Sequence, residues 1–155
     1  MPQMEKGGKY VFGWSQISEN GAVVIPAEAV DEYGLKTGTE VILISGSKSS
    51  GGFVMAIKSL LKKSQMGSIL TMKPELDGKQ SAEGQIVKIG DRKYCLSKVG
   101  DNNTIVLNAQ ILEAFGIGAG DRLLSVRGSY IGVSMISKGL IVECAKRHPE
   151  LKLFQ

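Results

Sequence analysis

The stretch that decides the fold is Gly21-Ala22-Val23-Val24-Ile25-Pro26-Ala27-Glu28-Ala29-Val30-Asp31-Glu32-Tyr33-Gly34-Leu35-Lys36-Thr37-Gly38-Thr39-Glu40-Val41. Its β-branched start predicts a strand that leads into a short helix. Pro26 suits the first helical position, where no backbone N–H is required. Val30 and Tyr33 share one face of that helix, and Gly34 ends it in the left-handed conformation.

Strands are predicted on both sides of this stretch. Asn20-Gly21 is typical of a tight turn, so a strand at residues 10–17 forms a hairpin with residues 22–25. After the turn at Gly38, further strands are expected at residues 40–45 and 53–57. This part of the chain therefore predicts a β-β-α-β-β unit.

The same pattern occurs again 82 positions further along the chain. Identical residues keep this register at Val24/Val106, Ala27/Ala109, Gly34/Gly116 and Gly38/Gly120. In the second copy Asn108 replaces Pro26 and suits an N-cap, since its side-chain oxygen can accept a free backbone N–H. We therefore predict repeat 1 at residues 9–65, a linker with a hairpin at 66–90, repeat 2 at 91–147 and a tail at 148–155.

A unit of this size buries too little surface to fold alone, so the two copies are expected to pack on each other. The linker between them, fully extended, spans roughly 80 Å and permits pairing within one chain or exchange between two chains. The predicted fold class is mostly β with short helices.

Composition excludes several classes of protein. The 155 residues include 19 Lys+Arg and 15 Asp+Glu, and 43% are hydrophobic. These values are ordinary for a globular protein and exclude global disorder, collagen and a disulfide scaffold. The longest uncharged stretch, residues 102–112, is far too short for a membrane helix, and the first residues lack a signal-peptide pattern. We expect a cytoplasmic protein without membrane association.

Residues for metal or nucleophilic chemistry are sparse. His148 is the single histidine, and it lies in a tail that we expect to be mobile. Cys95 and Cys144 stand outside any Cys-x-x-Cys spacing, which disfavours a zinc site. Residues 46–52 have the glycines of a phosphate loop but lack the Lys-Ser/Thr that follows them. We therefore expect no enzyme activity, no cofactor and no metal.

The quoted stretch resembles the AbrB/MazE/SpoVT swapped-hairpin family, whose pattern is a hairpin ending in Gly-x-Val-x-Ile-Pro, a short helix, Leu-Gly-Ile/Leu and a Gly-Asp turn. Residues 105–124 are a more divergent match, without the Pro but with Phe115-Gly116-Ile117 and Gly120-Asp121. The resemblance implies a swapped-hairpin β-barrel made from two interleaved β-β-α-β-β units, here fused as a pseudo-dimer. It also implies double-stranded DNA as the partner of a transcription regulator, or a toxin bound through a C-terminal tail.

In that family arginines contact DNA, and this chain departs from the pattern. The position after the hairpin Gly is Ala22 or Thr104, and the helices carry Asp31 and Glu113, whose carboxylates repel phosphate. The first-strand residues are Ser15-Gln16 and Ser97-Lys98. A patch of basic residues in copy two, beside turn asparagines that can read base edges, is the expected DNA face. The predicted nucleic-acid-binding residues are Lys98, Arg92, Lys93, Asn102, Asn103, Gln16 and Asn20.

A DNA-binding transcription regulator is therefore the first functional hypothesis, with a homodimer as an open further arrangement. The missing arginines motivate an alternative, which is a protein-interaction or self-assembly module on the same fold that has lost DNA binding. A second alternative is an antitoxin in which residues 139–155 capture a toxin.

Overall fold

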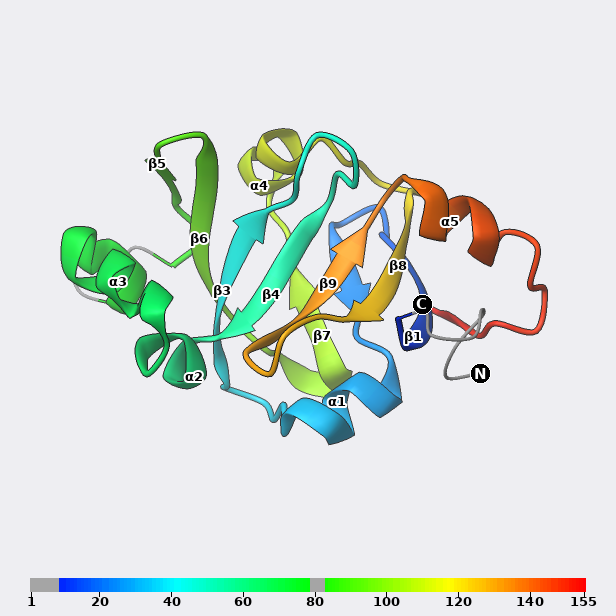
Figure 1. The fold of residues 1–155 in the computed structure, drawn as a ribbon, viewed down its shortest axis with the longest axis horizontal. Helices are drawn as coiled ribbons and strands as arrows, with labels where there is room; N and C mark the ends of the chain where they lie inside the picture. The colour runs from blue at the N-terminus through cyan, green and yellow to red at the C-terminus, as the bar shows by residue number, and fades with distance from the viewer. Residues whose placement is uncertain (1–8, 79–82) are drawn as a thin grey trace.

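The computed structural model describes residues 9–78 and 83–155 of the chain. Its strands are β1 (Val11–Gln16), β2 (Ala22–Val24), β3 (Glu40–Ser45), β4 (Phe53–Ile57), β5 (Ile86–Ile89), β6 (Arg92–Lys98), β7 (Thr104–Val106), β8 (Arg122–Arg127), β9 (Gly132–Ile136) and β10 (Leu153–Phe154). Its helices are α1 (Ala27–Tyr33), α2 (Lys58–Lys62), η1 (Gln65–Gly67), α3 (Ser68–Met72), η2 (Pro74–Asp77), η4 (Asp101–Asn103), α4 (Ala109–Phe115) and α5 (Leu140–Ala145). Figure 1 shows how these elements are arranged.

The order of elements agrees with the predicted pattern. The chain runs β1-β2-α1-β3-β4 in its first part and β6-β7-α4-β8-β9 in its second part. Asn108 is the N-cap of α4, where its side-chain oxygen accepts the N–H of Ile111 at 2.9 Å. Pro26 is the N-cap of α1 and lies one residue before its predicted position. Gly34 and Gly116 end the two helices in the left-handed conformation, as expected.

Strands from the two parts of the chain pair with each other. β1 pairs with β8 and β6 pairs with β3, so the first strand of each part lies beside the third strand of the other. β4 pairs with β9, and β2 pairs with β7 in a separate two-stranded ribbon. The interleaving predicted from the sequence is therefore formed within one chain.

β2 pairs with β7 and not with β1, so the predicted hairpin of residues 10–17 with 22–25 is wrong, because the strand after the turn pairs with the other part of the chain. Two equivalent hydrogen bonds join the turns after β1 and β6 to the opposite strand–helix junctions. The Leu107 N–H donates to the Gly21 carbonyl at 2.9 Å, and the Ile25 N–H donates to the Asn103 carbonyl at 2.8 Å. Gly21 has φ +83°, and a Cβ there would lie 2.1 Å from the Leu107 carbonyl oxygen. Only glycine allows this close approach.

The eight-stranded sheet has the order β10-β1-β8-β9-β4-β3-β6-β5. Its hydrogen bonding does not close into a barrel in the described residues, since β10 and β5 are its outer strands. Between the sheet, the ribbon and helices α1 and α4 lies the main core, in which Phe53 of β4 stacks on Phe115 of α4 with ring centroids 5.4 Å apart. Mostly β with short helices is confirmed as the fold class.

The segment predicted as a linker is largely helical. Helices η1, α3 and η2 follow α2 and, with it, bury Leu61, Leu70 and Leu76 against the outer face of the sheet. Tertiary contact stabilises these short helices, which explains why their sequence alone gave little signal. The predicted hairpin is confirmed as β5 and β6, while residues 79–82 lie outside the described part.

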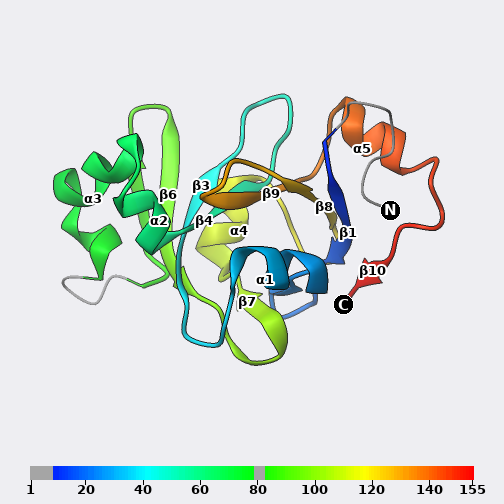
Figure 2. The same ribbon diagram turned by 60° about the horizontal axis from the view of Figure 1, so that its bottom comes forward.

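The C-terminal segment is folded, and the expectation of a mobile tail is wrong. α5 buries Val142 and Ala145 against Trp14 and other residues of β1 and β8. β10 then pairs in parallel with β1, with Trp14 opposite Leu153. Figures 1 and 2 show α5 and β10 at one side of the sheet and α2 and α3 at the other. No helix in the described residues is long and apolar enough to cross a membrane.

Candidate nucleic-acid interface

The strand registers define two opposite ends of the eight-stranded sheet. At one end Gln16 lies opposite Arg122, and Ser45 lies opposite Phe53. At the other end Glu40 lies opposite Lys98. We call these the Ser45 end and the Glu40 end.

The structure separates residues that the sequence placed in one patch. Arg92 and Lys93 begin β6 at the Ser45 end, whereas Lys98 ends β6 at the Glu40 end. An extended strand of this length spans about 20 Å at 3.3 Å per residue. The expected patch of these three residues beside Asn102 and Asn103 is therefore wrong, because β6 carries them to opposite ends of the sheet.

Lys98, Asn102 and Asn103 lie among groups that limit their role. The Lys98 Nζ lies 3.9 Å from the Glu83 carboxylate. Asn102 and Asn103 have φ of 59° and 58°, so they provide the left-handed conformations of the turn after β6. The Asn103 carbonyl is occupied by the Ile25 N–H, whereas Asn102 is exposed.

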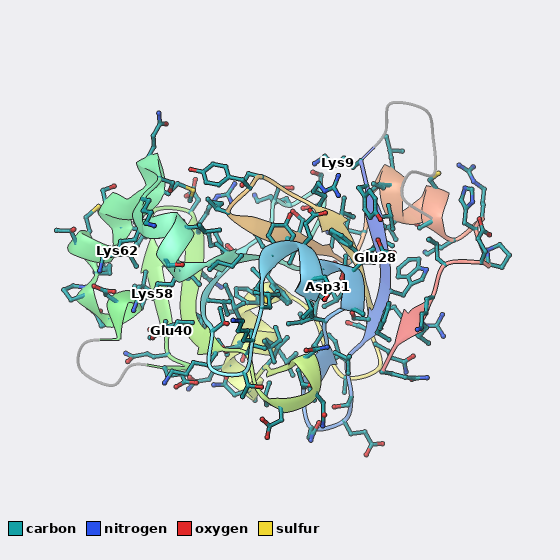
Figure 3. The ribbon with its side chains drawn as sticks, turned by 90° about the horizontal axis from the view of Figure 1, so that it is seen from below. Lys9, Glu28, Asp31, Glu40, Lys58 and Lys62 are labelled. Atoms are coloured by element: carbon teal, nitrogen blue, oxygen red, sulfur yellow. The ribbon has the colours of Figure 1, made fainter. Side chains whose placement is uncertain are left out.

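Carboxylates neutralise the cations at the Glu40 end. The Lys58 Nζ lies 3.3 Å from Glu40 and 2.9 Å from Asp77, and the Lys62 Nζ lies 3.5 Å from Asp77. The hydrogen bond from Lys58, together with the charges of Lys58 and Lys62, holds the pKa of Asp77 below its ordinary value. Figure 3, which views the molecule from below, labels Lys58, Lys62 and Glu40 at one side and Glu28 of α1 nearer the other.

Helix α1 adds acidic groups and neutralises one more cation. The Arg127 Nε donates to Glu32 at 2.7 Å, and the Arg127 Nη2 also contacts that carboxylate. The same guanidinium lies 4.2 Å above the Tyr10 ring, whose hydroxyl donates to Glu28. The hydrogen bond to Glu32 raises the pKa of Arg127 above its ordinary value, so the guanidinium keeps its charge. DNA phosphates would meet a negative surface here.

Cations without carboxylate partners lie at the Ser45 end. The Arg92 Nη1 donates to the Ser45 carbonyl at 3.4 Å, and the Lys93 backbone N–H donates to the Ser45 hydroxyl at 2.9 Å. Lys88 lies directly opposite Lys93 across the β5–β6 hairpin. These contacts place three basic side chains beside the end of β3.

The row of basic residues continues across the loop that follows Ser45. Both the Ser137 and Lys138 N–H groups donate to the Ser50 carbonyl, at 3.0 and 3.1 Å, so the loop that carries Lys48 lies against the end of β9. Lys138 and Arg122 then line one cavity. We call the following residues the basic row: Lys48, Lys88, Arg92, Lys93, Arg122 and Lys138.

No member of the basic row lies within 4.0 Å of a carboxylate in the part of the chain that the structure describes. Carboxylates also belong to this end of the sheet, among them Glu19, which is exposed in the turn after β1. Asp91 lies in the β5–β6 turn, and the Asp121 carboxylate accepts the Gly118 N–H at 2.8 Å. The six cations of the basic row therefore lie at the Ser45 end without a carboxylate partner, whereas Lys58, Lys62 and Arg127 at the other end each have one.

The remaining predicted residues belong to this end. Gln16 lies opposite Arg122, and Asn20 lies in the turn that follows β1. The Asn20 side-chain oxygen accepts the Ala22 N–H at 3.2 Å and so fixes the turn. The sequence prediction missed Arg122 and Lys138, because only the fold brings them beside the other cations. Lys88 could have been found from the Gly90-Asp91 turn, which sets the hairpin register.

Comparison with known proteins gives one family match. Residues 15–49 match the family described as "Antidote-toxin recognition MazE, bacterial antitoxin". No match to a curated protein sequence was found. The solved structure titled "The solution structure of PHS018 from pyrococcus horikoshii" aligns with 84% of this chain and 97% of its own, at 12% identity and a TM-score of 0.38. That likeness is too low to support a statement about this protein.

The matched residues run from the end of β1 through α1 and β3 into the loop that carries Lys48. They include the hairpin turn, the Ile-Pro junction and the helix-ending glycine on which the sequence resemblance was based. They also include Gly21 and Ile25, whose backbone groups form the two hydrogen bonds to the second part of the chain. Residues 15–49 are therefore a segment of the AbrB/MazE type, as the sequence predicted.

Proposed function

We propose that the protein is a cytoplasmic, DNA-binding transcription regulator whose basic row contacts the phosphates of double-stranded DNA. The observation that carries the proposal is the set of cations at the Ser45 end that have no carboxylate partner in the described residues. Phosphate neutralisation by Lys and Arg supplies much of the affinity for DNA. The Glu40 end, where Lys58, Lys62 and Arg127 are paired with carboxylates, then faces away from the nucleic acid.

The proposed interface places polar groups beside the cations. Gln16 at the end of β1 and Asn20 in the following turn lie near Arg122, where an amide group can read a base edge. Arg92 and Lys93 provide phosphate contacts at the other side of the same end. The proposal therefore retains Arg92, Lys93, Gln16 and Asn20 and leaves Lys98, Asn102 and Asn103 outside the interface.

The proposal includes a fused pseudo-dimer of two AbrB-like copies, at residues 9–65 and 91–147. The equivalent hydrogen bonds of Gly21 with Leu107 and of Asn103 with Ile25, which differ by the same shift of 82 positions, support it. Fusion makes the pairing of the copies intramolecular and removes its dependence on protein concentration.

Fluorescence anisotropy with a labelled random duplex, measured across a salt series, tests DNA binding. We expect binding that weakens steeply with salt. The double variant Arg92→Gln/Lys93→Gln should lower the slope of log K against log salt by about 2, since each lost phosphate contact removes about 0.9. The matched control is Lys36→Gln/Lys63→Gln, which removes two exposed charges away from the Ser45 end.

The control should bind as the unchanged protein does. Folded protein that binds no duplex at low salt would contradict the proposal and favour the protein-interaction module. An unchanged slope in the Arg92/Lys93 variant would show that DNA does not contact this end of the sheet.

The description of the matched family favours an antitoxin as the second candidate. Capture of a toxin by residues 139–155 requires α5 and β10 to leave the sheet, because both are packed against β1 and β8. It predicts a stable complex with a second protein that is lost when the chain ends after Lys138. A complex that survives this truncation would place the contact elsewhere.

A further inference from the structure

A cavity of about 600 Å³ lies where the C-terminal segment covers β1 and β8. Trp14 and Arg122 of the two strands form one side, and α5 with the residues up to β10 forms the other. Figure 1 shows α5 and β10 beside β1 and β8 at this place. The volume is in the range of sites for small molecules, which is about 300 to 1,000 Å³.

The inner wall of the cavity is apolar. Trp14 is 9% exposed and lies opposite Leu124 of β8 and Leu153 of β10. Val142 and Ala145 of α5 complete this wall. The indole ring therefore presents a small accessible surface to the cavity while its body is part of the core.

Basic side chains line the opening of the cavity, and their partners differ. Lys146 is bound to Glu143 at 3.1 Å, and the His148 ring nitrogen lies 2.8 Å from Glu150. These two are exposed or half-exposed pairs that water already screens.

Arg122 and Lys138 have no carboxylate within 4.0 Å in the described residues, although both line the cavity. Asp121 also lines it, and its Oδ2 accepts the Gly118 N–H at 2.8 Å. Asp121 offsets one of these two charges, so Arg122, Lys138 and Asp121 together leave a net positive charge in the cavity lining.

We propose that this cavity binds a small amphipathic anion, meaning a molecule with one carboxylate on an aliphatic or aromatic body. The carboxylate lies between Arg122, whose planar guanidinium suits bidentate binding, and Lys138. The apolar body packs against Trp14, Val142 and Leu153. The ligand uses both the apolar wall and the two cations of the cavity. An inorganic anion would contact only the cations, and a neutral apolar molecule would contact only the wall.

The inference does not depend on the proposed DNA binding, although the cavity shares Arg122 and Lys138 with the basic row. Ligand binding is therefore measured on the full chain without DNA. Trp14 is the single tryptophan of the chain, so its fluorescence reports directly on this cavity.

The probes are octanoate and phenylacetate, with octan-1-ol and 2-phenylethanol as neutral analogues and inorganic phosphate as the anion without a body. We expect at least one of the two carboxylates to change Trp14 emission saturably, and to bind at least about tenfold more tightly than its neutral analogue or phosphate. Calorimetric titration of the same probes gives the affinity independently of the fluorophore.

The double variant Arg122→Gln/Lys138→Gln should weaken carboxylate binding at least about tenfold, and the charge-matched control Lys36→Gln/Lys63→Gln should not. Thermal unfolding establishes that both variants are folded, which the exposure of all four side chains favours.

Four results would overturn the inference. One is the absence of saturable binding for both carboxylates, and another is equal affinity for a carboxylate and its alcohol. The third is unchanged affinity in the folded Arg122/Lys138 variant. Phosphate binding as tight as carboxylate binding would show a plain anion site of the basic row and would likewise exclude the proposed ligand class.

Discussion

Asp77 shows how one residue connects separate segments of this fold. It ends η2, and its carboxylate binds Lys58 at the start of α2 and Lys62 at the end of that helix. The Asp77 side chain is 16% exposed, so solvent screens these ion pairs only in part. Its lowered pKa makes the contribution of Asp77 to stability dependent on pH.

The pH dependence has a definite sign. Because the pKa of Asp77 is lower in the folded than in the unfolded state, its stabilising contribution is complete above the unfolded value, near about pH 4, and is lost as pH falls through the folded value. Asp77→Asn should lower the free energy of unfolding at neutral pH by up to about 1 kcal/mol. The variant should also lose less stability on acidification than the unchanged protein.

Urea unfolding at several pH values between neutral and about pH 2 measures both effects. Asp31→Asn is the control, because Asp31 is exposed on α1 and forms no ion pair in the described residues. Parallel pH profiles for the unchanged protein and Asp77→Asn would contradict the assigned role of the ion pairs.

At the scale of elements, α5 and β10 act as a cover for one side of the sheet. Val142 and Ala145 pack on Val11 and Trp14, and β10 adds a parallel strand next to β1. A segment that contributes to a core cannot at the same time be an unfolded capture segment. The free energy of unfolding that is lost when α5 and β10 are removed therefore distinguishes a structural cover from a detachable tail.

Ending the chain after Lys138 should lower the free energy of unfolding by about 2 kcal/mol or more, since it leaves a buried apolar surface open to water. Thermal and urea unfolding measure the loss, and hydrogen exchange should rise mainly in β1 and β8. The substitution Leu140→Ser, at a position 91% exposed, should change stability little and serves as the control. Unchanged stability after truncation would show that α5 and β10 contribute nothing to the core.

Elements with strong local signals were predictable from the sequence, and elements held by distant contacts were not. Asn108 and Gly116 mark the two ends of α4 through local backbone chemistry, so the sequence alone predicts both ends. Helices α2 and α3 have five residues each, and their stability comes from burial of Leu61 and Leu70 against the sheet. Such helices carry no distinct pattern in the sequence.

At the scale of the whole molecule, strand exchange and charge distribution are the two features that matter. The exchange was predicted from the repeated pattern, because neither part could bury its apolar face alone. The charge distribution was not predictable, since it depends on which cations have partners. Lys58 and Arg127 find carboxylates through the fold, whereas Arg92 and Lys138 find none in the described residues.

The strand pairing within one chain has a measurable result. The midpoint of urea unfolding should not change over about a hundredfold range of protein concentration, because no second chain is needed to complete the sheet. A midpoint that rises with concentration would show that the exchanged strands belong to two chains. Light scattering on the same samples gives the number of chains per particle and checks for further association of complete molecules.

The backbone carbonyls of Gly21 and Asn103 each accept a hydrogen bond from the strand–helix junction in the other part of the chain. In an assembly of identical subunits, any new side chain would occur at both related positions at once. Here the related positions have separate codons, so one side of the molecule can gain a feature that the other lacks. The cover formed by α5 and β10 lies on one side of the sheet and the helices α2 and α3 lie on the other, so the two sides differ within this one chain.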